Sequence, residues 1–220
     1  MIEFLVFMLG ASLGSFAKCY TDRYPNYFSS IHSCCPQCNH PLTISDLIPI
    51  ISYLFLKGKC LYCKKSIPIN YFISELVFGL CSLFIYLIDP SIIYLLNCLI
   101  TLSLVYIATV CDIKTQEIPD IVPIGFLIVI LLTCPTIDYK LSLIILFVGS
   151  IFSLLGKIGY GDIKLISIWT LYISDGIFLL LFIASFCCLF WSLANNKKDA
   201  PISFAPFLCI AYLIIHFFTW

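Results

Sequence analysis

Long apolar runs recur along this sequence, and no other feature limits its possible folds as strongly. They cover Ile2 to Ala17, Tyr71 to Ile88, Ile92 to Val110, Ile118 to Cys134, Leu141 to Leu155, Ile163 to Ile173, Ile177 to Ala194 and Ile202 to Phe218. A helix rises about 1.5 Å per residue and the hydrocarbon core of a bilayer is about 30 Å thick, so about 20 apolar residues form one crossing. The runs predict an all-α, polytopic membrane protein of about eight transmembrane helices.

The composition supports a membrane environment and excludes one class of partner. Hydrophobic residues make up 61% of the chain and charged residues only 11%, too little polar surface to cover a water-soluble globule. The net charge is zero and no long basic run is present, so we expect membrane lipid and no nucleic acid as a partner. The first run carries Glu3 instead of a basic residue, and no small-x-small cleavage site follows it, so we expect a retained span.

The positive charges predict how the spans are oriented, because Lys and Arg collect in cytoplasmic loops. With eight spans, eleven of the twelve positive charges face the cytoplasm and only Lys140 lies outside. Treating 163–194 as one crossing would place the lysine pair at 197–198 on the opposite side from Lys164. We therefore expect a short sixth helix that turns at 174–176, with both chain ends on the non-cytoplasmic side.

One polar segment divides the chain. Residues 1–17 are the predicted first transmembrane helix, 18–70 a small cytoplasmic domain, and 71–220 a seven-helix membrane domain. The middle segment is rich in Pro, Cys, Ser and Lys and too irregular for a long helix. Within it, Asp46 to Leu56 is apolar enough to pack against the membrane-embedded body.

Four cysteines in the polar segment have the spacing of metal ligands. Cys35 and Cys38 form one CxxC pair, and Cys60 and Cys63 form another. Two such pairs place four thiolates around one tetrahedral ion, as in a structural zinc ribbon. The alternatives are free thiols or a redox-active pair. Three neighbouring side chains are spare candidate ligands: His32, Cys34 and His40.

Two aspartates stand at corresponding ends of apolar runs, where a carboxylate is costly. Asp112 closes the third run and Asp162 opens the sixth, so both lie at the same depth on the same side. The alternative is that they are ordinary interfacial residues, with Asp162 as a helix N-cap. Asp120 is better explained as the cap of the fourth span.

A pair of nearby carboxylates can perform hydrolysis. Both cannot ionise cheaply at short range, so one keeps a proton while the other acts as a base toward water. Gly159 and Gly161, just before Asp162, have no side chain to obstruct a substrate strand. The pair and its glycine loop together favour a catalytic site over two unrelated caps.

The order of these motifs resembles the type IV prepilin peptidases, which are leader peptidases and N-methyltransferases of the GxGD aspartyl class. The matching elements are Gly14 to Phe16, Arg23 to Pro25, the paired CxxC motifs, Tyr71 with Glu75, DIKTQEIPD at 112–120, GYGDIKL at 159–165 and FAPF at 204–207. Ala205 stands where the family has glycine.

The resemblance implies a function and a set of site residues. Asp112 and Asp162 would be the catalytic dyad, and the four paired cysteines would bind zinc. The substrate and active-site loop would include Gly159, Gly161, Asp120 and Pro206. The enzyme would lie in the bacterial inner membrane and cleave prepilins or pseudopilins after a glycine. It would then methylate the new amino terminus from S-adenosylmethionine, an activity associated with the zinc-binding segment.

Two other interpretations remain open at this stage. A presenilin-like intramembrane protease shares a GD-containing loop, but the doubled CxxC and the IPD sequence at 118–120 argue against it. A non-catalytic transporter or assembly factor, stabilised by zinc, would use buried acids to carry protons or ions. It would be expected to place those acids at the bilayer centre and not at its edge.

Overall fold

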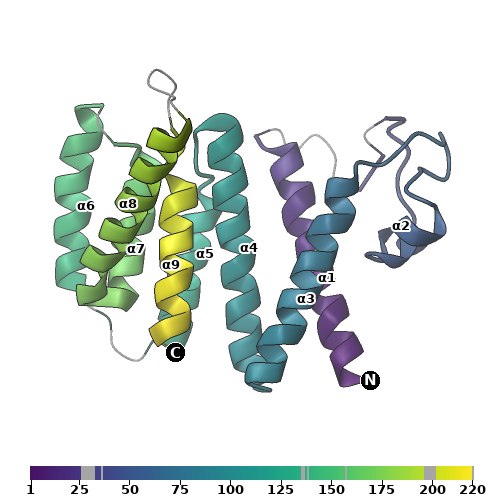
Figure 1. Cartoon of the computed structure of the whole chain (residues 1–220), viewed down its shortest axis with the longest axis horizontal. Helices are drawn as coiled ribbons and strands as arrows, with labels where there is room; N and C mark the ends of the chain where they lie inside the picture. The colour runs from purple at the N-terminus through teal and green to yellow at the C-terminus, as the bar shows by residue number, and fades with distance from the viewer. Residues whose placement is uncertain are drawn as a thin grey trace. The chain divides into compact units, whose positions relative to one another are not determined.

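A computed structural model describes residues 1–25, 33–35, 37–134, 137, 139–156, 158–195 and 202–219. Within these ranges the chain is helical and forms no strand, only isolated β-bridges, so the predicted all-α class is confirmed (Figure 1). The α-helices are α1 (Ile2–Arg23), α2 (Ile51–Phe55), α3 (Ile69–Ile88), α4 (Ile92–Thr115), α5 (Ile121–Thr133), α6 (Tyr139–Leu154), α7 (Tyr160–Ile173), α8 (Ile177–Asn195) and α9 (Ala205–Thr219). The 3₁₀ turns are η2 (Ile44–Leu47) and η3 (Ser174–Gly176).

Each of the eight predicted apolar runs forms a helix, but the helices differ in length. In the described part of the chain, four are long and apolar enough to cross a membrane, namely α1, α3, α4 and residues Ile177–Ala194 of α8. The apolar helices α5, α6 and α9 are shorter, and α7 has 14 residues. A multi-pass membrane protein is thus supported, while the count of eight crossings stays a prediction.

The helix boundaries change the position of two predicted features. α1 continues to Arg23, six residues beyond the predicted end of the first transmembrane helix. α4 continues to Thr115, which places Asp112 inside its last turn. The predicted turn at 174–176 is present as η3, where Ser174 has a φ of 48°.

The chain forms two compact units, Met1–Ser103 and Leu104–Trp220. In the first unit, α1 packs closely against α3. A Cβ atom at Gly10 would lie 2.4 Å from Ser82 Oγ, and one at Gly14 would lie 2.7 Å from the Ser74 carbonyl oxygen. Small residues four positions apart let two membrane helices approach this closely. Ser82 also donates to the Val6 carbonyl at 2.9 Å, which joins the two helices at the same level.

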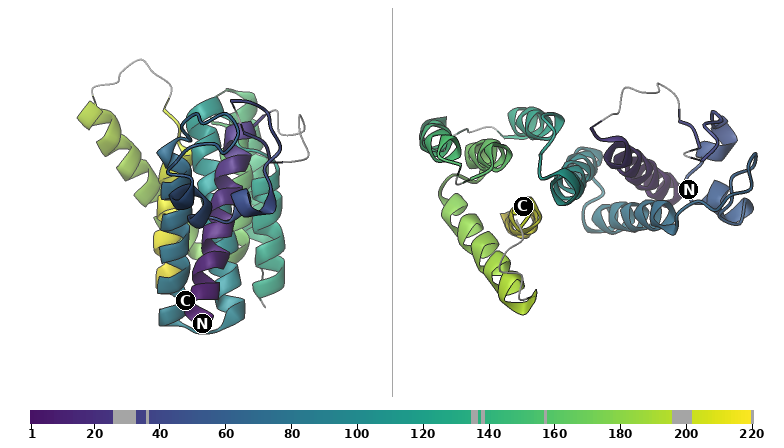
Figure 2. Two further views of the ribbon diagram at one scale, coloured as in Figure 1. Left: turned by 90° about the vertical axis from the view of Figure 1, so that its right-hand side faces the viewer. Right: turned by 90° about the horizontal axis from the view of Figure 1, so that it is seen from above.

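In the second unit, three buried aromatic side chains connect α5, α7 and α9. Trp169 stacks on Tyr212 with ring centroids 4.3 Å apart, and Phe126 meets both rings edge-on. Each is at most 2% exposed, so Trp169 is a packing residue and not an interfacial anchor. α9 lies next to α7 and α8 in the view from above (Figure 2). This cluster fixes α7, which carries Asp162 in its first turn.

α7 is also tied to α6 along its length. Ser142 donates a hydrogen bond to the Ser167 carbonyl at 2.7 Å, and both side chains are buried. A Cβ atom at Gly149 would lie 2.6 Å from Ile163 Cγ2, so the two helices nearly touch there. Because α7 contacts α5, α6 and α9, its first turn has a defined position.

Candidate active site and metal centre

Asp112 is held by the segment that begins α9. Its side chain is 7% exposed, and its Oδ2 accepts a hydrogen bond from the Ala205 amide at 3.1 Å. Ser203 Oγ donates to the Asp112 carbonyl at 3.1 Å. Pro206 follows in the first turn of α9, where its lack of an N–H costs nothing. The Ala205 amide, which has no partner within its own helix at this position, therefore donates to a carboxylate on α4.

Asp162 lies in the first turn of α7, but it is not the helix cap. Gly159 occupies the N-cap position and α7 begins at Tyr160, so the N-cap alternative for Asp162 is wrong. Its Oδ1 atom is buried and has no hydrogen-bond partner within the described residues. A buried carboxylate oxygen in this state is costly unless water, a proton or a substrate group meets it.

The two aspartates come together in the second unit. The Asp112 carboxylate lies close enough to that of Asp162 to interact with it electrostatically. The buried thiol of Cys209, on α9, interacts with both. The matched ends of the two apolar runs predicted equal depth but no separation, and the structure places the two carboxylates within electrostatic range of each other. Two carboxylates in one region permit acid and base chemistry.

The two glycines before Asp162 have separate steric roles. A Cβ atom at Gly159 would lie 3.2 Å from Asp162 Oδ2, and one at Gly161 would lie 3.0 Å from Ile118 Cβ. A side chain at Gly159 would press on the carboxylate, whereas one at Gly161 would push α7 away from the segment before α5. Both glycines thus set the position of Asp162, in addition to leaving room near it.

Asp120 pairs with a lysine of α7. It occupies the N-cap position of α5 without a side-chain cap hydrogen bond, so the predicted cap is correct in position only. Its Oδ1 instead accepts from Lys164 Nζ at 2.6 Å, and the Asp120 side chain is 73% exposed. Lys164 also lies over the Tyr160 ring, 4.8 Å from its centroid. Asp120 therefore connects the start of α5 to α7.

The four predicted zinc ligands gather at one point in the first unit. The Sγ atoms of Cys35, Cys38, Cys60 and Cys63 all lie within 4.8 Å of one another, and those of Cys35 and Cys63 are 4.0 Å apart. Tetrahedral thiolates at about 2.3 Å from zinc lie about 3.8 Å from each other. The cluster therefore fits a metal ion of this kind after a small contraction.

The two CxxC pairs sit on matching turns. The Asn39 amide donates to the Cys35 carbonyl at 2.9 Å, and the Lys64 amide donates to the Cys60 carbonyl at 3.0 Å. Asn39 and Lys64 also have positive φ angles of 54° and 59°. The amide of each first cysteine donates to the carbonyl five positions later. The distance is 3.0 Å from Cys35 to His40 and 2.9 Å from Cys60 to Lys65. Two copies of one turn, 25 positions apart, present the four thiols.

The surroundings shift the pKa values of two clustered cysteines in opposite directions. The His40 backbone lowers the pKa of Cys38, but burial and hydrogen bonds to the other three cysteines outweigh it and raise that pKa from 9.0 to about 11. Backbone N–H groups of Cys63 and Tyr62 lower the pKa of Cys60 from 9.0 to about 7. Among the spare candidates, Cys34 and His40 lie outside the cluster. The His40 ring stacks on Tyr62 at 3.5 Å. His32 falls outside the described residues.

Glu75 is a further buried group whose partners were not predicted. Its Oε1 accepts from Ser15 Oγ on α1 at 2.7 Å, and its Oε2 accepts from the Ile50 amide at 2.7 Å. Ile50 is the N-cap of α2 and has a φ of 64°. One carboxylate thus joins α1, α3 and the polar segment. A glutamate inside an apolar run was the available signal, but the run does not reveal a backbone partner 25 positions away.

Comparison with known proteins covers both units. The model of the bacterial peptidase A24 N-terminal domain matches residues 8–88, and that of the type IV leader peptidase family matches residues 98–193. No solved structure gives a significant match.

Three relatives, from Aeromonas salmonicida (strain A449), Vibrio cholerae and Bacillus subtilis, are named prepilin leader peptidase/N-methyltransferase. The first is 29% identical over 94% of this chain and 87% of the relative. The second is 28% identical over 93% and 92%, and the third is 33% identical over 74% and 71%. With both family models matched in order and relatives aligned over most of their length, the chain belongs to the type IV leader peptidase family.

Proposed function

We propose that this protein is an aspartyl endopeptidase that removes the short leader from type IV prepilins or pseudopilins, cutting after a glycine at the cytoplasmic face of the inner membrane. The observation that carries the proposal is the electrostatic interaction between the Asp112 and Asp162 carboxylates, which lie at the ends of apolar helices. The names of the relatives supply the substrate class.

The two carboxylates have different surroundings, which suggests different roles. Asp112 accepts a backbone hydrogen bond from Ala205, and such a donor favours the charged form of its acceptor. We therefore assign Asp112 the role of base toward the attacking water. Asp162 has a buried oxygen without a partner among the described residues, which suits a protonated acid that donates to the substrate carbonyl. Water attack then forms a tetrahedral intermediate and leaves its proton on Asp112. That proton passes to the amide nitrogen as the C–N bond breaks, Asp162 recovers its proton from the carbonyl hydroxyl, and the leader leaves with a new carboxyl group.

The second proposed activity is methylation of the new amino terminus. The family name of the relatives includes N-methyltransferase, and the polar segment with its cysteine cluster is present in this chain. We assign zinc to Cys35, Cys38, Cys60 and Cys63, where it would stabilise a segment too polar to build its own core. S-adenosylmethionine would be the methyl donor.

Two alternatives receive less support. A presenilin-like protease does not account for two matching CxxC turns, and none of the relatives cited above carries such a name. A transporter or assembly factor does not account for a carboxylate pair flanked by closely packed glycines.

The test is cleavage of a synthetic prepilin by the purified protein in lipid, read by mass spectrometry of both products. The proposal expects a single cut after the glycine and a mature product with an unmodified amino terminus. Adding S-adenosylmethionine should raise the mass of that product by one methyl group. Absence of cleavage would contradict the peptidase assignment. Cleavage without methylation would contradict the second activity alone.

A further inference from the structure

The short helix α2 lies beside α3, and its first residues contact α3 some way along that helix from its amino-terminal end. The Ile50 amide, at the beginning of α2, is 2.7 Å from Glu75 Oε2. Glu75 is the seventh residue of α3, so it lies about 9 Å along the helix from Ile69. Tyr53 of α2 packs on Phe72 of α3, with ring centroids 5.2 Å apart. These contacts hold α2 two turns inside a helix long and apolar enough to span a bilayer.

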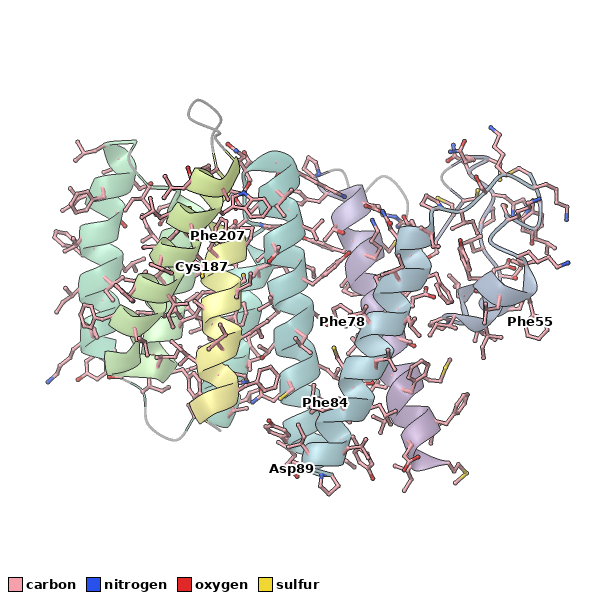
Figure 3. The ribbon with its side chains drawn as sticks, viewed as in Figure 1. Phe55, Phe78, Phe84, Asp89, Cys187 and Phe207 are labelled. Carbon is pink, nitrogen blue, oxygen red and sulfur yellow. The ribbon has the colours of Figure 1, made fainter. Side chains whose placement is uncertain are left out.

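The outer face of α2 is apolar and has no protein cover within the described residues. Leu54 is 60% exposed and Phe55 is 84% exposed, and Ile44 and Leu47 of the adjoining η2 are exposed at 86% and 46%. Phe55 points away from α3 (Figure 3). The apolar composition of the 46–56 segment predicts that it packs on the membrane-embedded body. Its inner side does so through Ile50 and Tyr53, whereas Leu54 and Phe55 face outward.

The neighbouring surface at this depth belongs to membrane helices. Phe16 of α1 directly follows Ser15, which donates to Glu75, and it is 58% exposed. Ile73 of α3 lies two positions before Glu75 and is 47% exposed. Exposed apolar residues on a spanning helix face acyl chains. Lipid would surround these exposed residues of α1 and α3, which lie beside Ser15 and Glu75 at the level where α2 begins.

A group of lysines borders this apolar face. Lys57 and Lys59 follow α2 within four residues, and Lys64 and Lys65 lie on the second cysteine turn, all with exposed side chains. Asp46, the acidic side chain of η2, is engaged by Thr43 at 2.7 Å. Leucine and phenylalanine beside lysine are typical of segments that lie at the bilayer surface, with basic groups near anionic headgroups.

We propose that α2 and η2 form a membrane-inserted anchor of the cysteine-bearing segment. Ile44, Leu54 and Phe55 enter the acyl region of an anionic bilayer, and Lys57 and Lys59 contact lipid phosphates. The partner is the lipid surface itself. The segment thus rests in the membrane and does not project freely into water. Glu75 sets its depth by binding the first amide of α2.

The test places the photoreactive residue benzoylphenylalanine at position 55 of the full-length protein in bilayers that contain phosphatidylglycerol. Illumination should give covalent lipid adducts at a yield within about threefold of the same residue at Phe84, which lies on α3 and is 65% exposed. The same probe at Tyr62, 40% exposed on the second cysteine turn, should give few. The proposal would be overturned if the probe at position 55 gave no lipid adduct while the probe at position 84 gave its normal yield of lipid adducts. A crosslink from position 55 to another protein would also overturn it.

The lysines are tested by the identity of the captured lipid. In mixed bilayers, adducts at position 55 should contain phosphatidylglycerol at up to about fivefold its bulk fraction. The double substitution Lys57→Gln and Lys59→Gln should return the ratio to the bulk value without lowering total lipid capture. Capture at the bulk ratio in the parent protein would contradict the headgroup contact. Loss of all capture in the double variant would contradict apolar insertion.

Discussion

The Ala205 amide donates a hydrogen bond to Asp112 Oδ2 over 3.1 Å, across 93 positions of sequence. It couples the first turn of α9 to the last turn of α4. Ser203 adds a second contact, from its hydroxyl to the Asp112 backbone carbonyl. The FAPF element at 204–207 therefore contacts Asp112 through a backbone amide and not through a side chain.

Removing that amide should lower the cleavage rate. Ala205→Pro deletes the N–H at a position in the first turn of α9 where proline is compatible with the helix. A hydrogen bond to a charged group contributes about 1.5–3 kcal/mol, so we expect a loss of about 10- to 100-fold in kcat. Ala205→Gly keeps the amide and should stay within about threefold of the parent. Equal rates for the two variants would contradict this role of the amide.

A side chain at Gly161 should disturb the site by steric pressure. Gly161→Ala places a Cβ 3.0 Å from Ile118 Cβ, and overpacking of this kind costs about 1–3 kcal/mol. Cleavage should fall and the melting temperature should drop. Ile118→Ala removes two of the three nearest atoms, Cδ1 and Cγ1, so the double variant should recover part of both losses. No recovery would indicate that Gly161 acts in another way.

Asp120 should be dispensable for chemistry. Its ion pair with Lys164 lies at the surface, and exposed pairs contribute about 0.2–1 kcal/mol. Asp120→Asn should therefore change kcat/KM by no more than about fivefold, and its effect should shrink at high salt. A complete loss of cleavage would mean that Asp120 takes part in the reaction.

Zinc should depend on the clustered cysteines and on pH. Cys35→Ser and Cys60→Ser should lose bound zinc, whereas Cys34→Ser, outside the cluster, should keep it. The folded pKa of Cys60 is about 7, below the ordinary 9.0. Its stabilising contribution is full above pH 9 and is lost as the pH falls through 7. Zinc measured after dialysis across this range should decline toward acid, since protons compete for thiolates.

Local patterns predicted much of this molecule. The apolar runs predicted the helices, and the doubled CxxC predicted the four-thiol cluster, because both depend on short-range spacing. The turn at 174–176 followed from charge placement. The matched ends of two runs also predicted the same depth and side for Asp112 and Asp162, but not the distance between them.

Long-range partners were out of reach of those patterns. The Ala205 amide and the Ile50 amide are backbone groups, and no side chain marks them as ligands of Asp112 and Glu75. Lys164 served in the sequence only to orient the spans, yet it pairs with Asp120 over 44 positions. Helix ends also shifted, because capping at Gly159 moved Asp162 into the first turn of α7. Such contacts depend on tertiary packing, which periodicity does not encode.

The most direct measurement is prepilin cleavage by membranes carrying the parent protein, Asp112→Asn or Asp162→Asn at matched expression. Asparagine keeps the shape of each side chain but cannot exchange a proton as a carboxyl group does. If the two carboxylates perform the hydrolysis, each variant should lose at least about a thousandfold in rate while retaining bound zinc. Cleavage within tenfold of the parent in either variant would contradict the dyad.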